Sequence, residues 1–208
     1  MKQVLLLFVL LCYTVTGKAS SEIALESDSL IEVLQTLPHD TTRLNVLNQI
    51  IRIEQNNYQC IQYSDTLMKE AIQLGNDKYA GMAAYYHILY YYNRNNQDSV
   101  TKWLTIMEPY VRKSDLWNYF FDAKRFQIDL YTFNEQYELA INESQKMKQQ
   151  ASQINSNRGT IAAYQCLSNA YIGSQRWDKG IEALEAAYQM LTPTENPVVR
   201  ISVLSQLV

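Results

Sequence analysis

The stretch AYQCLSNAYIGSQRWDKGIEALEAAYQMLTP, residues 163–193, contains two amphipathic segments separated by the polar residues GSQR. In the first segment Leu167 and Tyr171 stand four residues apart, which places them on one face of a helix. Gly180 and Leu184 have the same spacing in the second segment. The stretch therefore predicts a helix, a short turn and a second helix.

The same arrangement recurs upstream with a period of 40 residues. It appears in QNNYQCIQYSDTLMKEAIQL (55–74), NNQDSVTKWLTIMEPYVRK (95–113) and FNEQYELAINESQKMKQQA (133–151). Three columns keep this period: Cys60, Val100, Ala140 and Gly180; Ile51, Tyr91, Tyr131 and Tyr171; Leu67, Met107, Met147 and Ala187. A small residue in the second helix lets the pair approach closely, and a bulky residue near the end of the first helix fills the space between them. Such self-similarity indicates a repeat architecture.

The pattern resembles the tetratricopeptide repeat. In the unit 163–193, the family's large and small consensus positions hold Tyr164, Leu167, Tyr171, Trp177, Gly180, Leu184 and Ala187. There are departures: Ser168 and Gly180 stand where the family usually has glycine and alanine, Pro193 is one place late, and the period exceeds the usual length of about 34 residues. The third unit has Lys124 and Gln127 at two usually apolar positions. Over residues 41–208 the resemblance implies an all-α fold of antiparallel helix pairs, stacked as a right-handed superhelix of about four repeats.

The N-terminal sequence MKQVLLLFVLLCYTVTGKAS is typical of a secretory signal peptide. Lys2 provides a positive start, Val4 to Val15 is nearly all apolar, and Gly17 and Ala19 suit a cleavage site. We predict removal of residues 1–19; the alternative is an uncleaved anchor. The mature chain would carry 16 basic and 21 acidic residues. Clustered positive charge, which nucleic-acid binding requires, is missing from the sequence, so no nucleic-acid partner is expected.

Residues 20–40 are predicted to form a lead-in and a capping helix, with Leu30, Leu34 and Leu37 on one face. Pro38 ends this helix, and Asp40 or Thr41 can cap the next one. Four helix–turn–helix repeats then fill residues 41–196.

Residues 197–208 begin a fifth repeat, in which Ile201, Leu204 and Leu207 form an apolar stripe. A repeat cut within its first helix leaves an apolar face uncovered, so we expect the 208 residues to be part of a longer protein.

No catalytic or metal-binding pattern is present: the sequence has no glycine-rich phosphate loop, no CxxC and no HExxH. His39 is expected to be solvated in a turn, and His87 to be a buried, hydrogen-bonded core residue. Cys60 and Cys166 lie three repeats apart, and packed helices are spaced by about 8–10 Å, so both thiols are expected to be free and buried. No catalytic residue, metal or cofactor is predicted.

The stretch MAAYYHILYYYNRNNQDS, residues 82–99, becomes the first helix of the second repeat, with Tyr91 as its recurring core residue. In the resembled family, first helices line a concave groove. Among the positions that this likeness places in the groove, eight are the predicted binding residues: Arg52, Tyr85, Leu89, Tyr92, Arg125, Asp129, Gln165 and Asn169. Tyr86 and Tyr90 are expected to pack against neighbours. The alternative is that all five tyrosines only fill gaps between helices.

The leading functional hypothesis is an exported, non-catalytic binding or sensing region on the periplasmic side of the inner membrane. The signal sequence followed by long, Tyr-rich repeats looks like the extracytoplasmic part of bacterial sensor proteins. Its expected partner is a protein, a peptide, a small signal or a second copy of the chain, with membrane attachment only through a segment outside these residues. The alternatives are a stand-alone exported scaffold for envelope assembly or glycan uptake, and an enzyme built on a helical frame.

Overall fold

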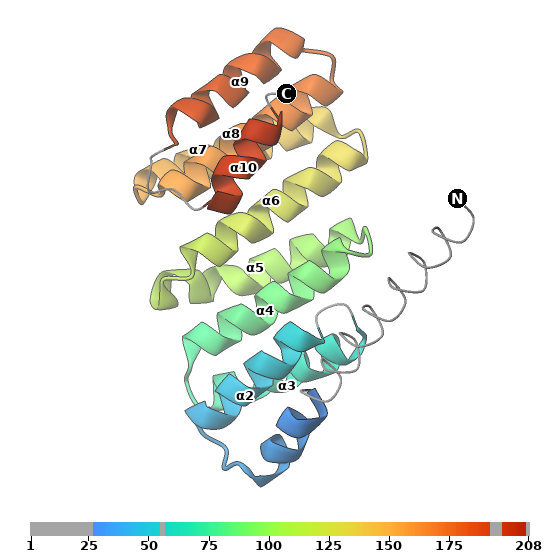
Figure 1. Ribbon diagram of the computed structural model, residues 1–208, viewed down its shortest axis with the longest axis vertical. Helices are drawn as coiled ribbons and strands as arrows, with labels where there is room; N and C mark the ends of the chain where they lie inside the picture. Colours follow the sequence, from blue (N-terminus) through green and yellow to red (C-terminus); the bar gives the residue numbers. More distant parts are fainter. Residues whose placement is uncertain (1–26, 55–56, 192–196, 207–208) are drawn as a thin grey trace, which may run out of the picture.

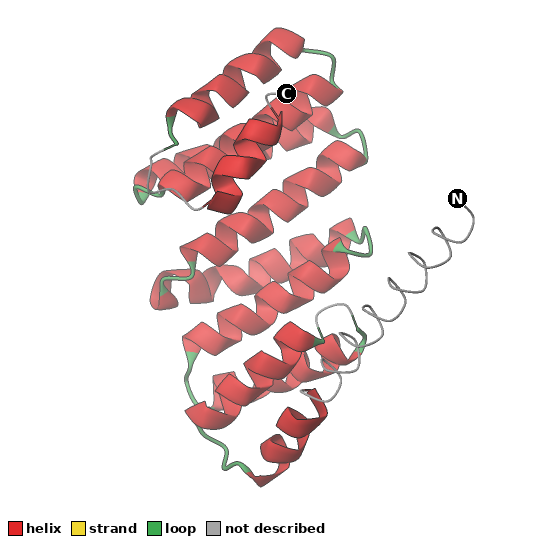
Figure 2. Cartoon of the chain, in the orientation of Figure 1, coloured by secondary structure: helices red, strands yellow, loops and turns green. Residues whose placement is uncertain are grey.

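The computed structural model describes residues 27–54, 57–191 and 197–206, and within these ranges all regular structure is helical (Figures 1 and 2). The predicted signal peptide, residues 1–19, lies outside the described residues. Residues 27–36 form a helix that leads into the stack. The helices that follow are α2 (Thr41–Ile53), α3 (Gln59–Gln73), α4 (Asp77–Tyr92), α5 (Gln97–Ser114), α6 (Trp117–Phe133), α7 (Tyr137–Gln153), α8 (Asn157–Gly173), α9 (Trp177–Gln189) and α10 (Pro197–Gln206). The all-α prediction is confirmed.

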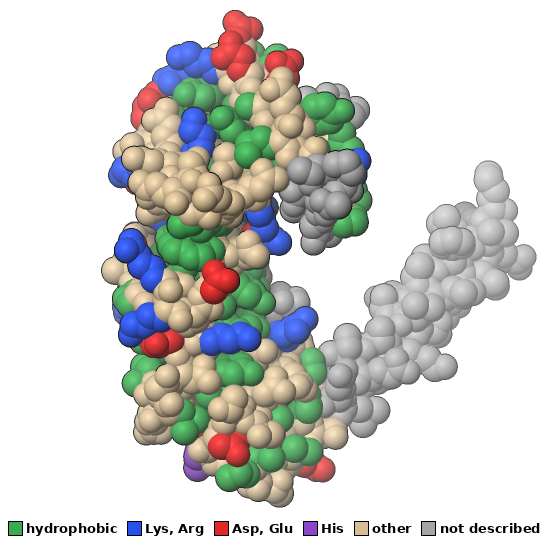
Figure 3. All heavy atoms as spheres, turned by 90° about the vertical axis from the view of Figure 1, so that its left-hand side faces the viewer, with side chains coloured by type: hydrophobic (Ala, Val, Ile, Leu, Met, Phe, Trp, Pro, Cys, Tyr) green, Lys and Arg blue, Asp and Glu red, His purple; other side chains and the backbone are tan. Residues whose placement is uncertain are grey.

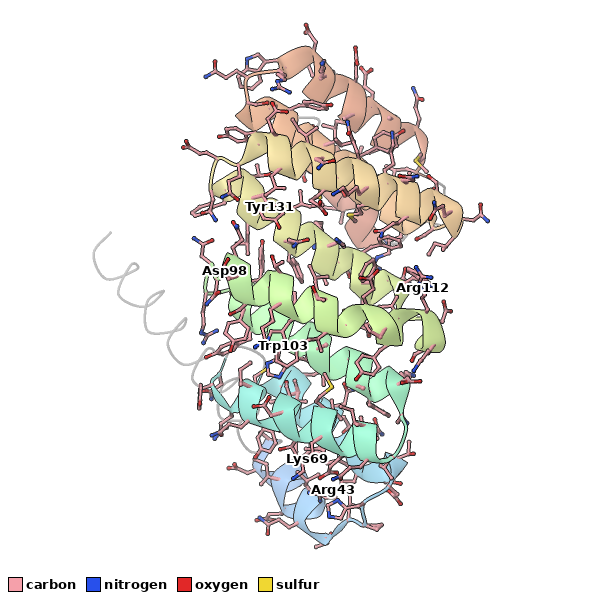
Figure 4. All side chains as sticks on the ribbon, turned by 180° about the vertical axis from the view of Figure 1, so that it is seen from behind. Arg43, Lys69, Asp98, Trp103, Arg112 and Tyr131 are labelled. Atoms are coloured by element: carbon pink, nitrogen blue, oxygen red, sulfur yellow. The ribbon has the colours of Figure 1, made fainter. Side chains whose placement is uncertain are left out.

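The helices pack as sequential antiparallel pairs, α2 with α3, α4 with α5, α6 with α7 and α8 with α9. The even-numbered helices lie toward the viewer in Figure 1, and α3, α5 and α7 are in front in the reverse view of Figure 4. Seen from the side, the stack forms an arc that is hollowed on the side of the even-numbered helices (Figure 3). This arrangement is consistent with a repeat array. In the described residues, no helix is both long and apolar enough to span a membrane.

The 40-residue columns explain why each pair closes. The small-residue column Cys60, Val100, Ala140 and Gly180 is buried throughout, as is the column Leu67, Met107, Met147 and Ala187. A Cβ on Gly180 would lie only 2.6 Å from Cγ1 of Ile172 on α8, so this position has no room for a side chain unless Ile172 shifts. The close approach predicted for the small residues is therefore present.

A second period, of 20 residues, lies in the backbone. Six turns between consecutive helices each contain one residue with a left-handed conformation, φ between 53° and 63°. These residues are Gly75, Asn95, Asp115, Glu135, Asn155 and Gln175. The amide of the following residue donates to a carbonyl five positions earlier, as Asn96 N does to Tyr91 O at 3.0 Å. This bond satisfies a carbonyl that the helix end would otherwise leave unpaired. The same turn therefore sets the same antiparallel return each time.

This turn makes a testable prediction. Gly75→Ala should lower the free energy of unfolding by about 1 kcal/mol, because a Cβ disfavours the left-handed conformation. No atom lies within 4 Å of the added Cβ, so the backbone term acts alone. Glu135→Gly should raise stability by a few tenths to about 1 kcal/mol for the converse reason. Urea denaturation measures both, and Gly75→Asn serves as a milder control. An alanine variant as stable as the parent would contradict the role of this turn.

The N-terminal end is fixed by polar contacts. Asp40 is the N-cap of α2, and its carboxylate accepts from Thr42 N at 2.8 Å, as one of the two predicted caps. Arg43 donates from Nε to both oxygens of the buried Glu70 on α3, and from Nη1 to the carbonyl of Leu34. One guanidinium thus ties α2, α3 and the leading helix together.

The third repeat has two polar residues at usually apolar positions, and each of them contacts a specific side chain on a neighbouring helix. Gln127, buried at an expected apolar position, donates from Nε2 to Thr101 Oγ1 at 3.0 Å. Lys124 lies 3.5 Å from the carboxylate of Glu143 on α7. These contacts give Gln127 Nε2 and the Lys124 ammonium group a partner, whereas Gln127 Oε1 is buried without a hydrogen-bond partner in the described residues. The two polar residues are therefore compensated only in part, since a buried polar group is costly when it lacks a partner.

At the C-terminal end of the stack, apolar side chains on α9 and α10 are more exposed than an equivalent side chain earlier in the array. Ile141 on α7 is 6% exposed beneath α8, whereas Ile181, 40 residues later on α9, is 53% exposed. On α10, Val203 is buried, while Ile201 and Leu204 of the predicted stripe remain exposed; Leu207 lies outside the described residues. Two residues of the predicted fifth-repeat stripe, Ile201 and Leu204, are therefore largely uncovered in the described part of the chain.

Candidate binding site on the concave face

Six of the eight predicted groove residues are partly exposed on the first helices of their repeats. Tyr85, Leu89 and Tyr92 lie on α4, Arg125 and Asp129 on α6, and Asn169 on α8. Arg52 is exposed at the end of α2, and Gln165 on α8 is buried. Their helices form the hollowed side of the arc (Figure 3). Tyr86 and Tyr90 are buried, as expected.

An aromatic cluster joins α4 to α6. The ring of Tyr92 stacks on Phe126, with centroids 4.5 Å apart and an interplanar angle of 20°. Tyr85 meets Tyr119 edge-on at 5.0 Å. The guanidinium of Arg125 lies 5.3 Å from the centre of the Phe126 ring. The predicted residues Tyr85, Tyr92 and Arg125 thus belong to one connected group, and Phe126 links them.

A hollow of about 380 Å³ opens beside this cluster, where α4 and α6 end. Its lining consists of Tyr92, Asn93, Asn95, Asp129, Leu130 and Phe133. The side chain of Phe133, the last residue of α6, is 73% exposed, which is unusual for a phenylalanine. Two predicted groove residues, Tyr92 and Asp129, are therefore brought together at one concave feature.

Asp129 has an unusual electrostatic environment. Burial raises the pKa of its carboxyl group to about 6, and the nearby Arg125 guanidinium only partly opposes this. In the described residues, no hydrogen bond and no ion pair within 4 Å holds the carboxylate of Asp129. Burial and the charge of Asp129 also raise the pKa of the neighbouring Tyr92 hydroxyl. A desolvated carboxylate without a close partner at a hollow is the kind of group found at functional sites.

The C-terminal part of the predicted groove is occupied by the chain itself. Gln206 on α10 donates from Nε2 to Asn169 Oδ1 at 3.1 Å and accepts from Gln165 Nε2 at 3.0 Å. Figure 1 shows α10 lying across α8. Gln165 and Asn169 therefore contact an intramolecular helix, and the open part of the concave face lies on α4 and α6.

The remaining reactive residues do not form a second site. Cys60 and Cys166 are free and buried, as predicted. His87 is buried, with its ring stacked on Trp103 of α5 at 3.7 Å (labelled in Figure 4). Its Nε2 lies 3.1 Å from Asp65 Oδ1, but neither Nε2 nor Nδ1 makes a hydrogen bond of acceptable geometry in the described residues, so the expected burial is found and the expected hydrogen bonding is not. Among the described residues, no cluster of His, Cys, Asp or Glu has metal-binding geometry.

Sequence reasoning missed three contributors: Phe126, Phe133 and Gln206. Phe133 stands at the first position of the polar segment FNEQ, so it was grouped with the turn. Phe126 directly follows Arg125 and carried no signal of its own. Gln206 depends on how α10 folds back, which no local pattern shows.

The comparisons with known proteins add no assignment to this geometry. The chain matches no protein-family model, no curated protein and no solved structure.

Proposed function

We propose that this chain is a repeat-based binding region that takes a protein or peptide partner, or a small signal, on the concave face of α4 and α6. The tetratricopeptide-like sequence pattern supports this proposal because arrays of that type present their first helices to ligands. The observation that carries it is the hollow beside Tyr92 and Asp129, where a desolvated carboxylate and a 73% exposed phenylalanine meet.

The region is proposed to act without catalysis, as the exported, extracytoplasmic part of a bacterial signal-transduction protein. Export rests on the signal-like N-terminal sequence. In this role, a partner held on α4 and α6 would bias the conformation of the stack, and the stack would pass that bias to an attached output module. Two first helices that share one ligand are a suitable device, because the ligand then favours one spacing between neighbouring repeats.

Tyr92→Ala should weaken binding of the physiological partner about tenfold or more, because aromatic anchors at the centre of an interface dominate its energy. The partner would be sought by cross-linking in the periplasm and its affinity measured by calorimetry. Tyr188→Ala is the matched control, since Tyr188 is an exposed tyrosine on α9, away from the concave face. Far-ultraviolet circular dichroism should be unchanged in both. If the Tyr92 and Tyr188 variants bind the partner with equal affinity, the concave face is not the binding surface.

The second candidate function is an exported scaffold that assembles through its C-terminal end. Trp177 and Ile181 on α9, together with Ile201 on α10, are exposed apolar residues that a protein partner could cover. In that case Ile181→Lys, and not Tyr92→Ala, should abolish partner binding. A coding sequence that continues into a membrane-spanning segment and an output domain would favour the sensor.

A further inference from the structure

We propose that the hollow between the ends of α4 and α6 binds an alkylammonium group, such as a lysine side chain of a partner or a free amine. This inference rests on the proposed function, because it names the ligand chemistry of the same concave site. Three features support it: the charge of the residues that line the hollow, the C-terminal ends of the two helices, and the aromatic rings of Tyr92 and Phe133.

The lining is rich in acceptors and has a single charge. Among the described residues that line the hollow, Asp129 is the one with a charged side chain. Asn93, Asn95 and Tyr92 add amide and hydroxyl oxygens. An ammonium group carries three donors and no acceptor, so it matches such a set, whereas a carboxylate would face Asp129 directly. The carboxylate has no close partner of its own, and an incoming cation would supply the missing one.

The helix geometry favours the same sign of charge. The hollow lies where α4 ends at Tyr92 and α6 ends at Phe133. The C-terminal end of a helix carries the negative end of its dipole, so two such ends favour a cation. Both helices contribute because they run parallel in successive repeats, and Figure 1 shows them side by side on the concave side of the stack.

The rings fit the rest of the ligand. Phe133 is mostly exposed at the rim, and Tyr92 is held in place by its stacking on Phe126. Aromatic faces attract ammonium groups and also cover apolar methylenes. An alkylammonium presents both features, which a bare metal ion or a hydrated small cation lacks.

Among the described residues, no cationic side chain lines the hollow. The guanidinium of Arg94 lies 3.5 Å from the centre of the Tyr90 ring and donates to the Tyr90 carbonyl at 3.2 Å. Arg125 stands one turn before Asp129 on α6, against the ring of Phe126. Neither arginine is among the lining residues, so in the part of the chain that the structure describes the hollow is open to an external cation.

The test uses butylammonium as the probe, titrated at pH 7.5 into the isotope-labelled chain and followed by amide chemical shifts. Saturable shifts are expected around Asn93, Asn95 and Phe133, whereas butanol and butyrate, the uncharged and anionic matches, should give none there. Asp129→Asn should weaken binding about tenfold or more, as expected when a charge-assisted contact is lost. Asp178→Asn, at an exposed aspartate on α9, should leave binding unchanged.

A second arm separates the two sources of the group. The peptide acetyl-Gly-Lys-Gly-amide should bind, and its norleucine counterpart, which lacks the charge, should not. Tighter binding of the lysine peptide than of butylammonium would indicate a peptide partner, and the reverse a free amine. Butanol or butyrate shifting the same amides, or full affinity in Asp129→Asn, would overturn the proposal.

Failure here is distinguishable from failure of the proposed function. If Tyr92→Ala abolishes partner binding but butylammonium does not bind, the concave face stands and the cation is wrong. If butylammonium binds through Asp129 while partner binding ignores Tyr92, the hollow is an amine site and the proposed partner surface is wrong.

Discussion

Phe121→Ala should lower the free energy of unfolding by about 3–5 kcal/mol, the largest single-residue effect expected in this chain. Phe121 lies on α6 with no exposed surface and is the largest of the fully buried side chains. Its ring packs against Trp117 and Phe120 on the same helix. Truncation would leave a cavity between the third and fourth helix pairs, where Phe121 contacts α8, that these rigid neighbours cannot close.

The ring of Phe121 packs directly against Gly159 on α8, where the absence of a side chain makes room for it. A Cβ added there would lie 2.6 Å from Cδ2 and 2.7 Å from Cε2 of Phe121, closer than atoms can approach. Gly159→Ala should therefore destabilise by about 1–3 kcal/mol, because it overpacks the interface between α6 and α8. The smaller side chain of leucine at position 121 would relieve the contact with α6, whereas the Cβ of Ala151, 2.9 Å from the added methyl group, would still have to shift.

The combination of Phe121→Leu with Gly159→Ala should be more stable than the sum of the two single changes predicts. Residues in contact typically show such interaction energies of about 0.5–3 kcal/mol. Urea denaturation of the four proteins in the cycle gives the value directly. Ala183→Gly, at a buried position on α9 remote from the pair, controls for a generally looser stack. Strict additivity would mean that Phe121 and Gly159 do not share an interface.

The fold could be predicted from the sequence because large and small side chains recur at helical spacing, and this recurrence indicates which helices pack together. The column of Cys60, Val100, Ala140 and Gly180 is readable since close helix approach demands small residues there. The 20-residue turn period was not readable. Its left-handed position holds Gly, Asn, Asp, Glu and Gln in different turns, so the regularity is in φ and not in residue type.

The candidate site was accessible only in part. Family positions led to Tyr92 and Asp129, which the structure brings together at one hollow. The same reasoning placed Gln165 and Asn169 on an open groove, but α10 folds back and Gln206 contacts both. Such a contact depends on the path of the chain between residues 191 and 197, and periodicity within a repeat carries no information about that path.

The stability of the chain should be nearly independent of pH between about 4.5 and 6, because the buried His87 and the partly buried Asp129 oppose each other there. Burial lowers the pKa of His87 from an ordinary 6.5 to about 4, although the nearby Asp65 partly offsets this. Burial raises the pKa of Asp129 from 3.8 to about 6. For each group, the difference between the ordinary and the folded pKa corresponds to roughly 3 kcal/mol.

The signs are opposite. As pH falls below 6.5, the unfolded chain protonates His87 before the folded chain does, so the stability present above pH 6.5 is lost progressively toward pH 4. Asp129 behaves in reverse: the folded chain holds its proton up to about pH 6, so the stability present below pH 3.8 is lost as pH rises through 6. Substituting one of the two groups should therefore reveal the pH dependence of stability that the other group causes.

Asp129→Asn should therefore lose stability as pH falls from 6.5 to 4.5, whereas His87→Phe, which keeps a ring against Trp103, should lose stability as pH rises over the same interval. Urea midpoints at pH 4.5, 5.5, 6.5 and 7.5 measure both slopes, with Asp178→Asn as the control that should follow the parent. At pH 7.5 Asp129→Asn should exceed the parent by about 1–3 kcal/mol, because the desolvated carboxylate is gone. A group retained at such a cost to the fold is expected to serve binding. If Asp129→Asn is no more stable than the parent at pH 7.5, the carboxylate is well solvated, and the electrostatic case for a cation in the hollow fails with it.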